Sequence, residues 1–422
     1  MNIEKFIADK ISLSGKDKGN ISKPIVKIGI IGIVLGVAVM LLTLSVVIGF
    51  KKEITNKITG LTMDIAISNV NVNPSNEPEP IKINEDTLGL IRKIRLIKHI
   101  QITAFKNGIL KTKTENEGIL LKGIDKNYDF SFLTKHLMEG AMPVLSDSNR
   151  SKDILISKSL ADKLDLKLKD KMVIYFIAQH EVYDSTIKET VIKSEQNSRD
   201  LYICGIFKTD FSDFDNNLTF VDIKQIQKLN YWKAGMVGSY ELKLNEFKDI
   251  ETCKSEIETI LGYNYSINSV KEVYSNIFVW LDKLDINGII IIVLMILVAI
   301  INMITALLIL ILERTNMVGL LKALGMTNRE ISKIFIYISF KLVGKGLLWG
   351  NIIGIGLCYI QYYFKIAKLD SATYYVDYVA IDINWFYILI LNAGIFITCM
   401  LMLLLPTLII SKLTPIKTLR FD

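Results

Sequence analysis

Long apolar runs with few charged residues constrain this chain of 422 residues more than any other feature. An α-helix needs roughly 20 consecutive apolar residues to cross the hydrocarbon core of a bilayer. Four runs reach that length, namely Ile28–Phe50, Gly288–Leu312, Ile334–Phe364 and Trp385–Ser411. The first lacks a small-residue cleavage site, so we expect a retained anchor and not a signal peptide. We therefore predict four transmembrane helices.

The distribution of lysine and arginine predicts the orientation of these helices. Basic residues concentrate in the cytoplasmic loops of membrane proteins. They cluster in three segments, 1–27, 313–333 and 412–422. We expect these segments to be the cytoplasmic arm, loop and tail, so both termini are cytoplasmic. Residues 51–287 and the short loop 365–384 are then periplasmic, and the protein is a multi-pass protein of the bacterial inner membrane.

The segment 51–287 is long enough to form a domain with its own core. Half of the whole chain is hydrophobic and 22% is charged, which is typical of a membrane protein that carries a polar domain. Short runs typical of strands, at 118–124, 153–158, 172–178, 201–207 and 239–244, alternate with helical patterns at 86–97 and 247–261. We predict an α+β periplasmic domain with two lobes.

No catalytic constellation is visible in the sequence. HEVYD at 180–184 begins like a zinc-protease motif, but Asp184 replaces the second histidine and the preceding MVIYFIA is typical of a strand. We interpret HEVYD as a solvated loop. No GxxxxGK[ST] phosphate loop and no GxSxG elbow occur. We predict that the chain is not an enzyme and binds no cofactor or metal.

Composition argues against two further classes. The net charge of +7 arises from basic residues that flank apolar runs, so we expect membrane topology and not nucleic-acid binding to explain it. The four cysteines show no CxxC spacing, so neither a zinc site nor a disulfide framework is predicted.

Small and amide residues recur inside the predicted helices. Glycines at four-residue spacing permit close approach of two helices. They occur in the first and third runs, as Gly32, Gly36, Gly346, Gly350 and Gly354. Asn302, Asn351 and Asn392 place one amide in each of three runs. Packing within the chain explains the glycines, and a subunit interface is the alternative; hydrogen bonds between helices explain the amides.

The loop between the second and third runs contains LLKALGMTNREI, residues 320–331. Its apolar residues are predicted to form one side of a short helix: Val318, Leu320, Leu321 and Leu324. Gly325 can adopt the left-handed conformation that ends a helix. Thr327 and Glu330 form a T-x-x-E capping box that begins the next helix. A C-cap followed at once by an N-cap predicts a rigid elbow, and we interpret it as a docking element that carries motion between a cytoplasmic partner and the membrane.

Around this elbow the sequence ERTNMVGLLKALGMTNREISKIF resembles the cytoplasmic loop of FtsX/MacB-like permeases of ABC transporters. Within that superfamily the chain is most similar to the lipoprotein-releasing permease branch, LolC/LolE. Further similar segments, in order, are FIADK, GIIGIVLGVAVMLLTLSVVIGFKKEITNKITG, LMEGAMP, DILISKSLADKLDLKLKDKM, ICGIFKTDFSDFDNNLTFVDIKQIQKL, YYVDYVAIDINW and PTLIISKLTPIKTLRFD.

The resemblance implies roles for particular residues. Coupling to a separate ATPase subunit would fall on Glu313, Arg314, Val318, Leu320, Leu321, Lys322, Leu324, Gly325 and Arg329. A substrate cleft and its helix packing would involve Gly32, Gly36, Gly49, Asn302, Gly346, Gly350 and Gly354. Contact with a periplasmic lipoprotein carrier would fall on the arm 178–199, with Ala178, Glu181, Tyr183 and Arg199.

The implied function is extraction of lipid-anchored lipoproteins from the inner membrane. The implied partners are a cytoplasmic ABC ATPase dimer that binds ATP and Mg²⁺, a second permease copy or paralogue, the lipoprotein substrate, a periplasmic carrier and membrane lipids. Alternatives are an efflux-type permease like MacB or a signalling subunit like FtsX. A membrane-anchored receptor or structural protein is the alternative from a different class.

Overall fold

A computed structural model describes residues 4, 6–7, 22–71, 77–111, 115–184 and 189–402, without the side chains of 22–26 and 178–195. The chain divides into two compact units. The helical unit comprises Met1–Lys52, Trp280–Lys368 and Tyr378–Asp422, and the sheet unit comprises Glu53–Val279 and Leu369–Asp377.

The helical unit is built from four long helices and one short one. Their bounds are α2 (Ser22–Thr62), α10 (Ser275–Glu313), α11 (Thr315–Ala323), α12 (Asn328–Phe364) and α14 (Trp385–Met402). Among the described residues, four helices are long and apolar enough to cross a membrane. The predicted set of four apolar helices is therefore confirmed. Residues 403–411 of the last predicted run lie outside the described residues.

Two of these helices extend well beyond the apolar runs that predict them. α2 has 41 residues and α10 has 39, so each is about 60 Å long at 1.5 Å per residue. This is about twice the thickness of a hydrocarbon core. Their polar ends are good helix formers, such as the sequence KKEITNK that follows Phe50.

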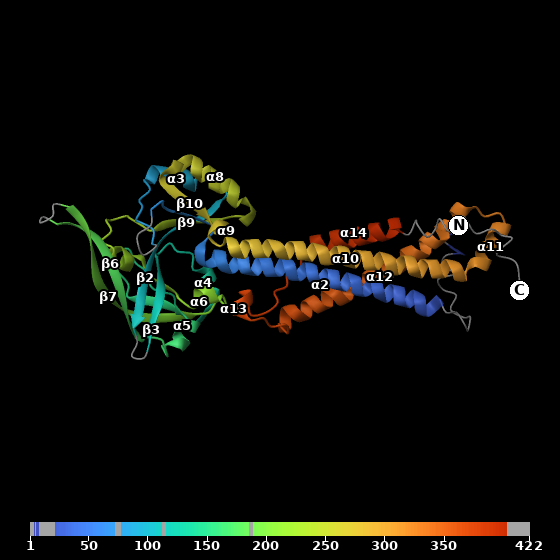
Figure 1. Cartoon of the computed structure of the whole chain (residues 1–422), viewed down its shortest axis with the longest axis horizontal. Helices are drawn as coiled ribbons and strands as arrows, with labels where there is room; N and C mark the ends of the chain where they lie inside the picture. Colours follow the sequence, from blue (N-terminus) through green and yellow to red (C-terminus); the bar gives the residue numbers. More distant parts are fainter. Residues whose placement is uncertain are drawn as a thin grey trace. The chain divides into compact units, whose positions relative to one another are not determined.

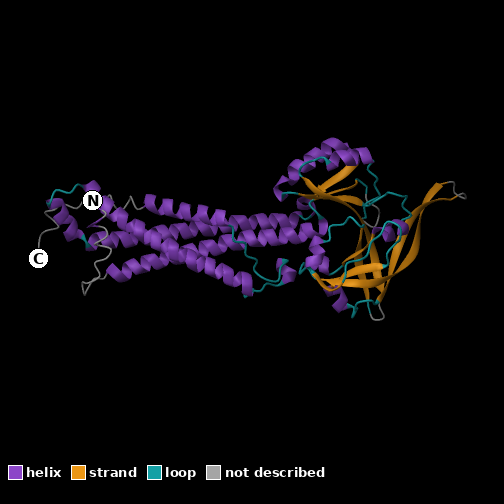
Figure 2. Ribbon diagram, turned by 180° about the vertical axis from the view of Figure 1, so that it is seen from behind, coloured by secondary structure: helices purple, strands orange, loops and turns teal. Residues whose placement is uncertain are grey.

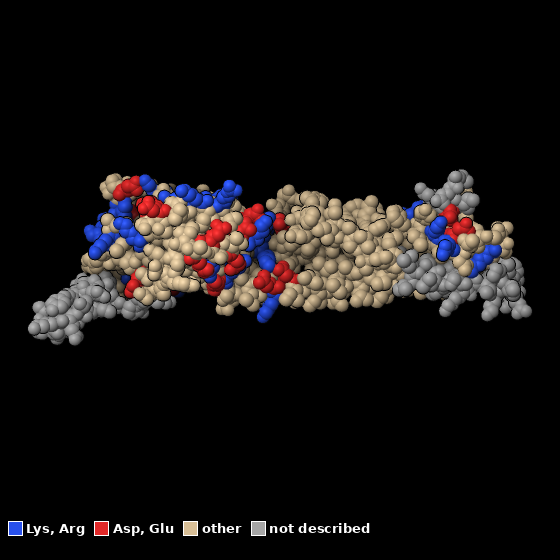
Figure 3. Space-filling model, turned by 90° about the horizontal axis from the view of Figure 1, so that it is seen from above, with Lys and Arg blue, Asp and Glu red and all other residues tan. Residues whose placement is uncertain are grey.

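The helices pack through a shared apolar core. α2, α10 and α12 lie side by side (Figure 1), and side chains that are completely buried between them include Ile33, Val37, Leu307 and Phe335. On the face drawn in Figure 3, a wide band of the helical unit carries neither basic nor acidic side chains. A band of this kind is the surface that a lipid-facing helix bundle requires.

The sheet unit contains ten strands, shown in orange in Figure 2. They are β1 (Ile65–Asn69), β2 (Ile97–Lys111), β3 (Asn116–Ile124), β4 (Leu137–Gly140), β5 (Asp153–Ser157), β6 (Lys171–Asp184), β7 (Glu189–Phe207), β8 (Leu218–Asp222), β9 (Ser239–Leu244) and β10 (Tyr265–Ser269). In chain order all ten fall between α2 and α10. Five predicted strands correspond to β3, β5, β6, β7 and β9.

Strand pairing gives the sheet two parts that share β2. The order is β10-β1-β9-β2-β3-β8-β5-β7-β4, and β6 pairs with both β7 and β2. The second pairing, Ile109 with Tyr175 and Leu110 with Ile174, closes a ring of six strands. β9, β1 and β10 extend from the other end of β2. Closing a ring removes exposed strand edges.

Short helices accompany the sheet. They are α3 (Glu85–Arg92), α4 (Ser131–Lys135), α5 (Lys158–Lys163), α6 (Ser212–Asp215), α7 (Ile223–Leu229), α8 (Ile250–Leu261), α9 (Val270–Val273) and α13 (Ser371–Tyr374), with 3₁₀ turns η1 (Phe247–Asp249) and η2 (Gly262–Asn264). α3 and α8 match the two predicted helical patterns. The pattern at 86–97 is only half helical, because the chain turns after Arg92 and β2 begins at Ile97.

The prediction that HEVYD is a loop is wrong. His180 to Asp184 belong to β6, where they pair in register with β7 down to Asp184 and Glu189. The two strands form a long hairpin that projects from the sheet (Figure 2). Pairing with β7 along the whole segment therefore determines its structure.

A charged pair lies in the core of the sheet unit. Lys122 is completely buried, and its Nζ is 2.8 Å from a carboxylate oxygen of Glu241 and donates to the carbonyl of Leu61 at 2.6 Å. Burial lowers the pKa of Lys122, while the charge of Glu241 opposes this shift. Gln101 also donates to Glu241, at 2.9 Å. A buried charge is tolerated only with partners of this kind.

Candidate coupling elbow and helix-packing site

The elbow begins with α11, which ends in a Schellman motif. The N–H of Gly325 donates to the carbonyl of Lys322, and the N–H of Met326 donates to that of Leu321, both at 3.0 Å. Gly325 has φ of +95°. This is the conformation that a Schellman motif requires and that side chains with a Cβ atom disfavour. The predicted glycine cap is confirmed.

A second cap follows immediately. Thr327 accepts from the backbone N–H of Glu330 at 3.4 Å, and the Glu330 carboxylate accepts from the N–H of Thr327 at 2.8 Å. This reciprocal pair is the predicted capping box at the start of α12. Only Met326 lies between the two caps, so the direction of the chain is determined on both sides of the bend.

The apolar residues of the elbow face two directions and not one. Val318 is completely buried in the core of the helical unit, and Leu321 packs against that core. Leu320 is 54% exposed and Leu324 is 74% exposed. The prediction that these four residues form one side of the helix is therefore wrong. Residues 318 and 320 lie about 200° apart around a helix, whereas 320 and 324 are neighbours on one face.

The charged residues assigned to coupling differ in their exposure. Glu313 and Arg329 are exposed, and Lys322 is half-buried. Arg314 is the residue before α11, and its Nε is buried with no hydrogen-bond partner in the described part of the chain. The elbow therefore exposes two leucines, Leu320 and Leu324, and also two charged residues, Glu313 and Arg329.

The glycines of α12 lie directly against α2. A Cβ atom added to Gly346 would lie 2.6 Å from Ile33, and one added to Gly350 would lie 2.6 Å from Val37. At Gly354 the nearest atom, in Leu41, would be 3.0 Å away. Because these distances are below van der Waals contact, the three glycines permit an approach that no larger residue allows. In this structure the three glycines therefore serve packing between two helices of the same chain.

The glycines of α2 contact other partners. A Cβ atom at Gly32 would lie 2.6 Å from the side-chain amide of Asn302 in α10. At Gly49 it would lie 2.5 Å from the backbone of Asp382, whose N–H donates to the carbonyl of Ser45 at 3.1 Å. Gly36 has only ordinary contacts. α2 is thus held by α10, by α12 and by the segment before α14.

An ion cluster that the sequence analysis did not identify joins the same elements. Lys51 of α2 contacts Asp282 at 2.9 Å and Asp285 at 2.5 Å, both in α10. Lys52 contacts Asp382 at 3.1 Å. A usable signal was present in the sequence, since KK directly follows the first apolar run and two acids directly precede the second.

The residues assigned to carrier contact lie on the β6–β7 hairpin. Ala178, Glu181 and Tyr183 belong to β6, and their side chains are outside the described residues. Arg199 lies in β7, where it pairs with Ile174. The expected extended arm is therefore present. Of the four residues assigned to carrier contact, only Arg199 has a side chain that the structure describes.

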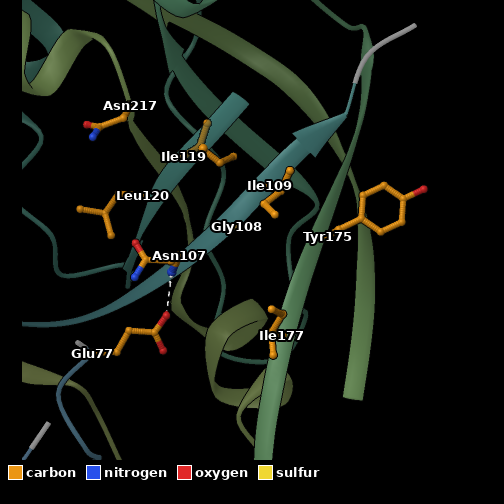
Figure 4. Close-up of a pocket in the computed structure, with 10 residues that line it drawn as sticks. Glu77, Asn107, Gly108, Ile109, Ile119, Leu120, Tyr175, Ile177 and Asn217 are labelled. Atoms are coloured by element: carbon orange, nitrogen blue, oxygen red, sulfur yellow. Dashed lines mark hydrogen bonds between the residues drawn. The ribbon is translucent and has the colours of Figure 1, made fainter. Parts of the chain in front are cut away.

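A pocket of about 440 Å³ lies on the sheet unit between β2, β3 and β6 (Figure 4). Ile109, Ile119 and Ile177 line it, and Glu77 closes one side by accepting from the backbone N–H of Asn107 at 2.8 Å. Glu77 also pairs with buried Lys106 at 2.9 Å, so its carboxylate is engaged in structure. Among the described residues, no group of three or more His, Cys, Asp or Glu side chains could hold a metal ion.

These features define a class of protein. Four long apolar helices, a capped elbow between the second and third, and a sheet-rich domain fit a membrane-embedded permease subunit. Family comparisons agree: the FtsX-like permease C-terminal family matches residues 289–415, and the MacB-like periplasmic core domain matches residues 28–260. The chain belongs to the FtsX/MacB-like family of ABC transporter permeases.

Similar proteins extend along nearly the whole chain. The "Lipoprotein-releasing system transmembrane protein LolC" of Xylella fastidiosa (strain Temecula1) is 21% identical over 93% of this chain and 93% of its own. The corresponding LolE protein of Haemophilus influenzae is 21% identical over 99% of each chain. The solved periplasmic region of MacB from Actinobacillus actinomycetemcomitans is 13% identical, with a TM-score of 0.34, over 53% of this chain and 97% of that one. The predicted resemblance is confirmed, and membership of this family implies an ABC ATPase and a second permease subunit as partners.

Proposed function

We propose that this permease extracts lipid-anchored lipoproteins from the inner membrane and passes them to a periplasmic carrier. The observation that carries the transport mechanism is the elbow, where two caps hold a bend that exposes Leu320 and Leu324. Similarity to lipoprotein-releasing proteins over almost the entire length supports the choice of substrate. ATP and Mg²⁺ bind to the partner ATPase dimer and not to this chain.

In this proposal the elbow is cytoplasmic, as are residues 1–27 and 412–422. Residues 51–287 and 365–384 are periplasmic. The basic residues that flank the apolar runs support this orientation. ATP-driven closure of the ATPase dimer moves the elbow, and α12 transmits that motion because the capping box leaves no flexible residue between Met326 and the helix.

The cleft is formed with a second permease, either an identical copy or a paralogue. The surface of α10 supports this step, because large apolar side chains along it are about half exposed: Ile290, Leu294, Leu297 and Ile301. Such a stripe can contact lipid, a second permease or the acyl chains of a substrate. Gly32 lets α2 lie close to Asn302 of α10, and Gly49 lets it lie close to the segment before α14.

A carrier is required on energetic grounds. Three acyl chains with about 15 methylenes each would lose roughly 36 kcal/mol on full exposure to water. Release into solvent is therefore excluded, and the lipid anchor passes from the cleft to a protein that shelters it. The β6–β7 hairpin is the proposed contact with that carrier, because it is the extended arm of the sheet unit.

The test is a release assay with the chain and its ATPase in proteoliposomes that contain a radiolabelled lipoprotein. We expect lipoprotein to co-purify with the complex, and to appear in the soluble fraction only when ATP and a carrier are both present. Export of a soluble drug or peptide without lipoprotein release would instead identify an efflux permease. ATP-dependent activation of a periplasmic enzyme without transport would identify a signalling subunit.

A further inference from the structure

A basic pocket lies on the sheet unit and shares no lining residue with the β2–β3–β6 pocket. It has a volume of about 670 Å³ and is lined by Arg150, Lys224, Gln227, Lys228, Tyr231 and Trp232. No acidic side chain lines it. Arg199 of β7 does not line the pocket but lies near it, because the N–H of Tyr202, three residues further on, donates to the carbonyl of Lys152 at 2.8 Å. Burial lowers the pKa of Arg199, and the nearby charge of Arg150 lowers it further. Four cations are thus gathered by segments that lie far apart in the sequence.

The cations of this pocket differ in how they are used. Lys224 donates to the backbone carbonyls of Asp147 and Asn149, at 2.7 and 3.4 Å. Among the described residues, the side chains of Arg150 and Lys228 form no ion pair and no hydrogen bond. The Nε of Arg199 is buried and also lacks a hydrogen-bond partner in the described part of the chain. The Nη1 of Arg199 donates to the carbonyl of Ser198 at 2.8 Å. Arg150 and Lys228 are therefore fully available to an anion, and Arg199 is available through its remaining N–H groups.

The backbone around Arg150 is held in place from both sides. Lys224 donates to the carbonyls of Asp147 and Asn149, which precede Arg150. After it, the N–H of Ser151 donates to Asp222 at 2.8 Å, and Gln225 donates to the carbonyl of Ser151 at 2.6 Å. Asp222 accepts from the backbone N–H groups of Ser151 and Lys224 and is not among the residues that line the pocket. An anchored arginine loses less conformational freedom when it binds a ligand.

The aromatic side of the pocket is also built into the fold. Tyr231 has φ of +56°. This conformation is energetically unfavourable for a residue with a Cβ atom, and it recurs at functional sites. The turn is held by the N–H of Trp232, which donates to the carbonyl of Gln227 at 2.9 Å. The side chain of Gln227 donates to the carbonyl of Met236 at 2.9 Å. Trp232 is half-buried at the edge of the cations.

We propose that Arg150, Arg199 and Lys228 bind a phosphate group, and that Trp232 contacts the organic part attached to it. Guanidinium groups match phosphate oxygens with paired hydrogen bonds, and a dianion is favoured where several cations have no acidic neighbour. The phosphate belongs either to a phospholipid headgroup or to a small phosphate ester in the periplasm. This site shares one residue, Arg199, with those assigned to lipoprotein release.

The experiment is equilibrium dialysis of the full chain in detergent against radiolabelled inorganic phosphate and, separately, radiolabelled dihexanoylphosphatidylglycerol below its micelle concentration. We expect saturable binding of at least one of them with Kd at or below about 1 mM. Tighter binding of the lipid identifies a headgroup, and equal or tighter binding of phosphate identifies a small ester. The absence of saturable binding by both overturns the proposal.

Variants and a competitor test the location and the selectivity. Arg150→Gln and Lys228→Gln should each weaken binding about tenfold, which corresponds to about 1.4 kcal/mol. Lys233→Gln, an exposed lysine outside the pocket lining, is the matched control and should change Kd less than twofold. Equal effects of all three substitutions, or displacement of phosphate by acetate at the same concentration, would overturn the assignment. Because Arg150 and Lys228 are exposed, both variants should fold normally.

Discussion

Asn351 of α12 and Asn392 of α14 exchange two side-chain hydrogen bonds. The Nδ2 of Asn351 donates to the Oδ1 of Asn392 at 2.6 Å, and the Nδ2 of Asn392 donates to the Oδ1 of Asn351 at 2.9 Å. Each amide also donates to a carbonyl of its own helix, that of Leu347 or Ile388. Every N–H of both side chains is therefore bonded, which is the arrangement that an apolar environment requires.

This amide pair should link α12 to α14 cooperatively. Asn392→Leu should lower the free energy of unfolding by about 1 kcal/mol, because it also leaves the amide of Asn351 with unpaired groups. The Asn351→Leu/Asn392→Leu double variant should lose less than the sum of the two single variants. Steric-trapping measurements in bicelles provide these values, and strictly additive losses would show that the amides do not interact.

Close packing of α2 on α12 should be sensitive to a single methyl group. Gly350→Ala places a carbon atom 2.6 Å from Val37, so we expect a loss of about 1–3 kcal/mol from overpacking. Gly356→Ala is the matched control, since an added Cβ atom there has nothing within 4 Å. Thermal unfolding in detergent compares the two. Equal unfolding temperatures of the two variants would mean that α2 and α12 are not closely packed at Gly350.

The thiols of the sheet unit should be unreactive in the folded protein. Burial raises the pKa of Cys204 to about 12 and that of Cys253 to about 11. At pH 8 only about one ten-thousandth of Cys204 is then thiolate, which is the form that reacts. We expect alkylation by iodoacetamide only after unfolding, measured by mass spectrometry of the separate peptides. Rapid labelling of Cys204 in the native protein would contradict the buried environment.

The same shifts give a pH dependence with a defined sign. The folded pKa values lie above those of the unfolded thiols, so the folded state retains more protons at alkaline pH. The contribution to stability is therefore complete below about pH 8.5 and is lost as the pH rises toward 11–12. Cys204→Ala should reduce this alkaline loss, as urea unfolding at pH 8 and pH 10 would show.

Local features of the fold could be predicted from the sequence, whereas pairings between distant segments could not. Apolar runs predict the helices because membrane insertion depends on composition, and Gly325 with the T-x-x-E pattern predicts the elbow because caps are local. The closure of six strands through Ile109 and Tyr175 depends on residues more than 60 positions apart. The basic pocket likewise joins Arg150 to Lys228 only in the folded chain. The opposite directions of Val318 and Leu320 could also be predicted from the sequence, because residues two positions apart lie about 200° apart around a helix.

Strain at the elbow should uncouple the transporter without unfolding it. Gly325→Val forces a β-branched residue into a left-handed conformation at a cost of about 1–2 kcal/mol, although nothing obstructs its side chain. We expect ATP hydrolysis to continue while lipoprotein release per ATP falls severalfold. Gly262→Val introduces a larger strain in the sheet unit, at φ of +63° and ψ of −153°, and should nevertheless preserve the ratio. An equal loss of coupling in both variants would remove the special role of the elbow.

Contact between the elbow and the ATPase is the most direct test of the account. A photo-crosslinking residue at Leu324, which is 74% exposed, should form a covalent adduct with the ATPase subunit in the membrane. The same residue at Leu90 in α3, which is 52% exposed, should form none. If an active complex shows no adduct at Leu324 or Leu320, the elbow does not receive the motion of the ATPase, and the proposed mechanism is wrong.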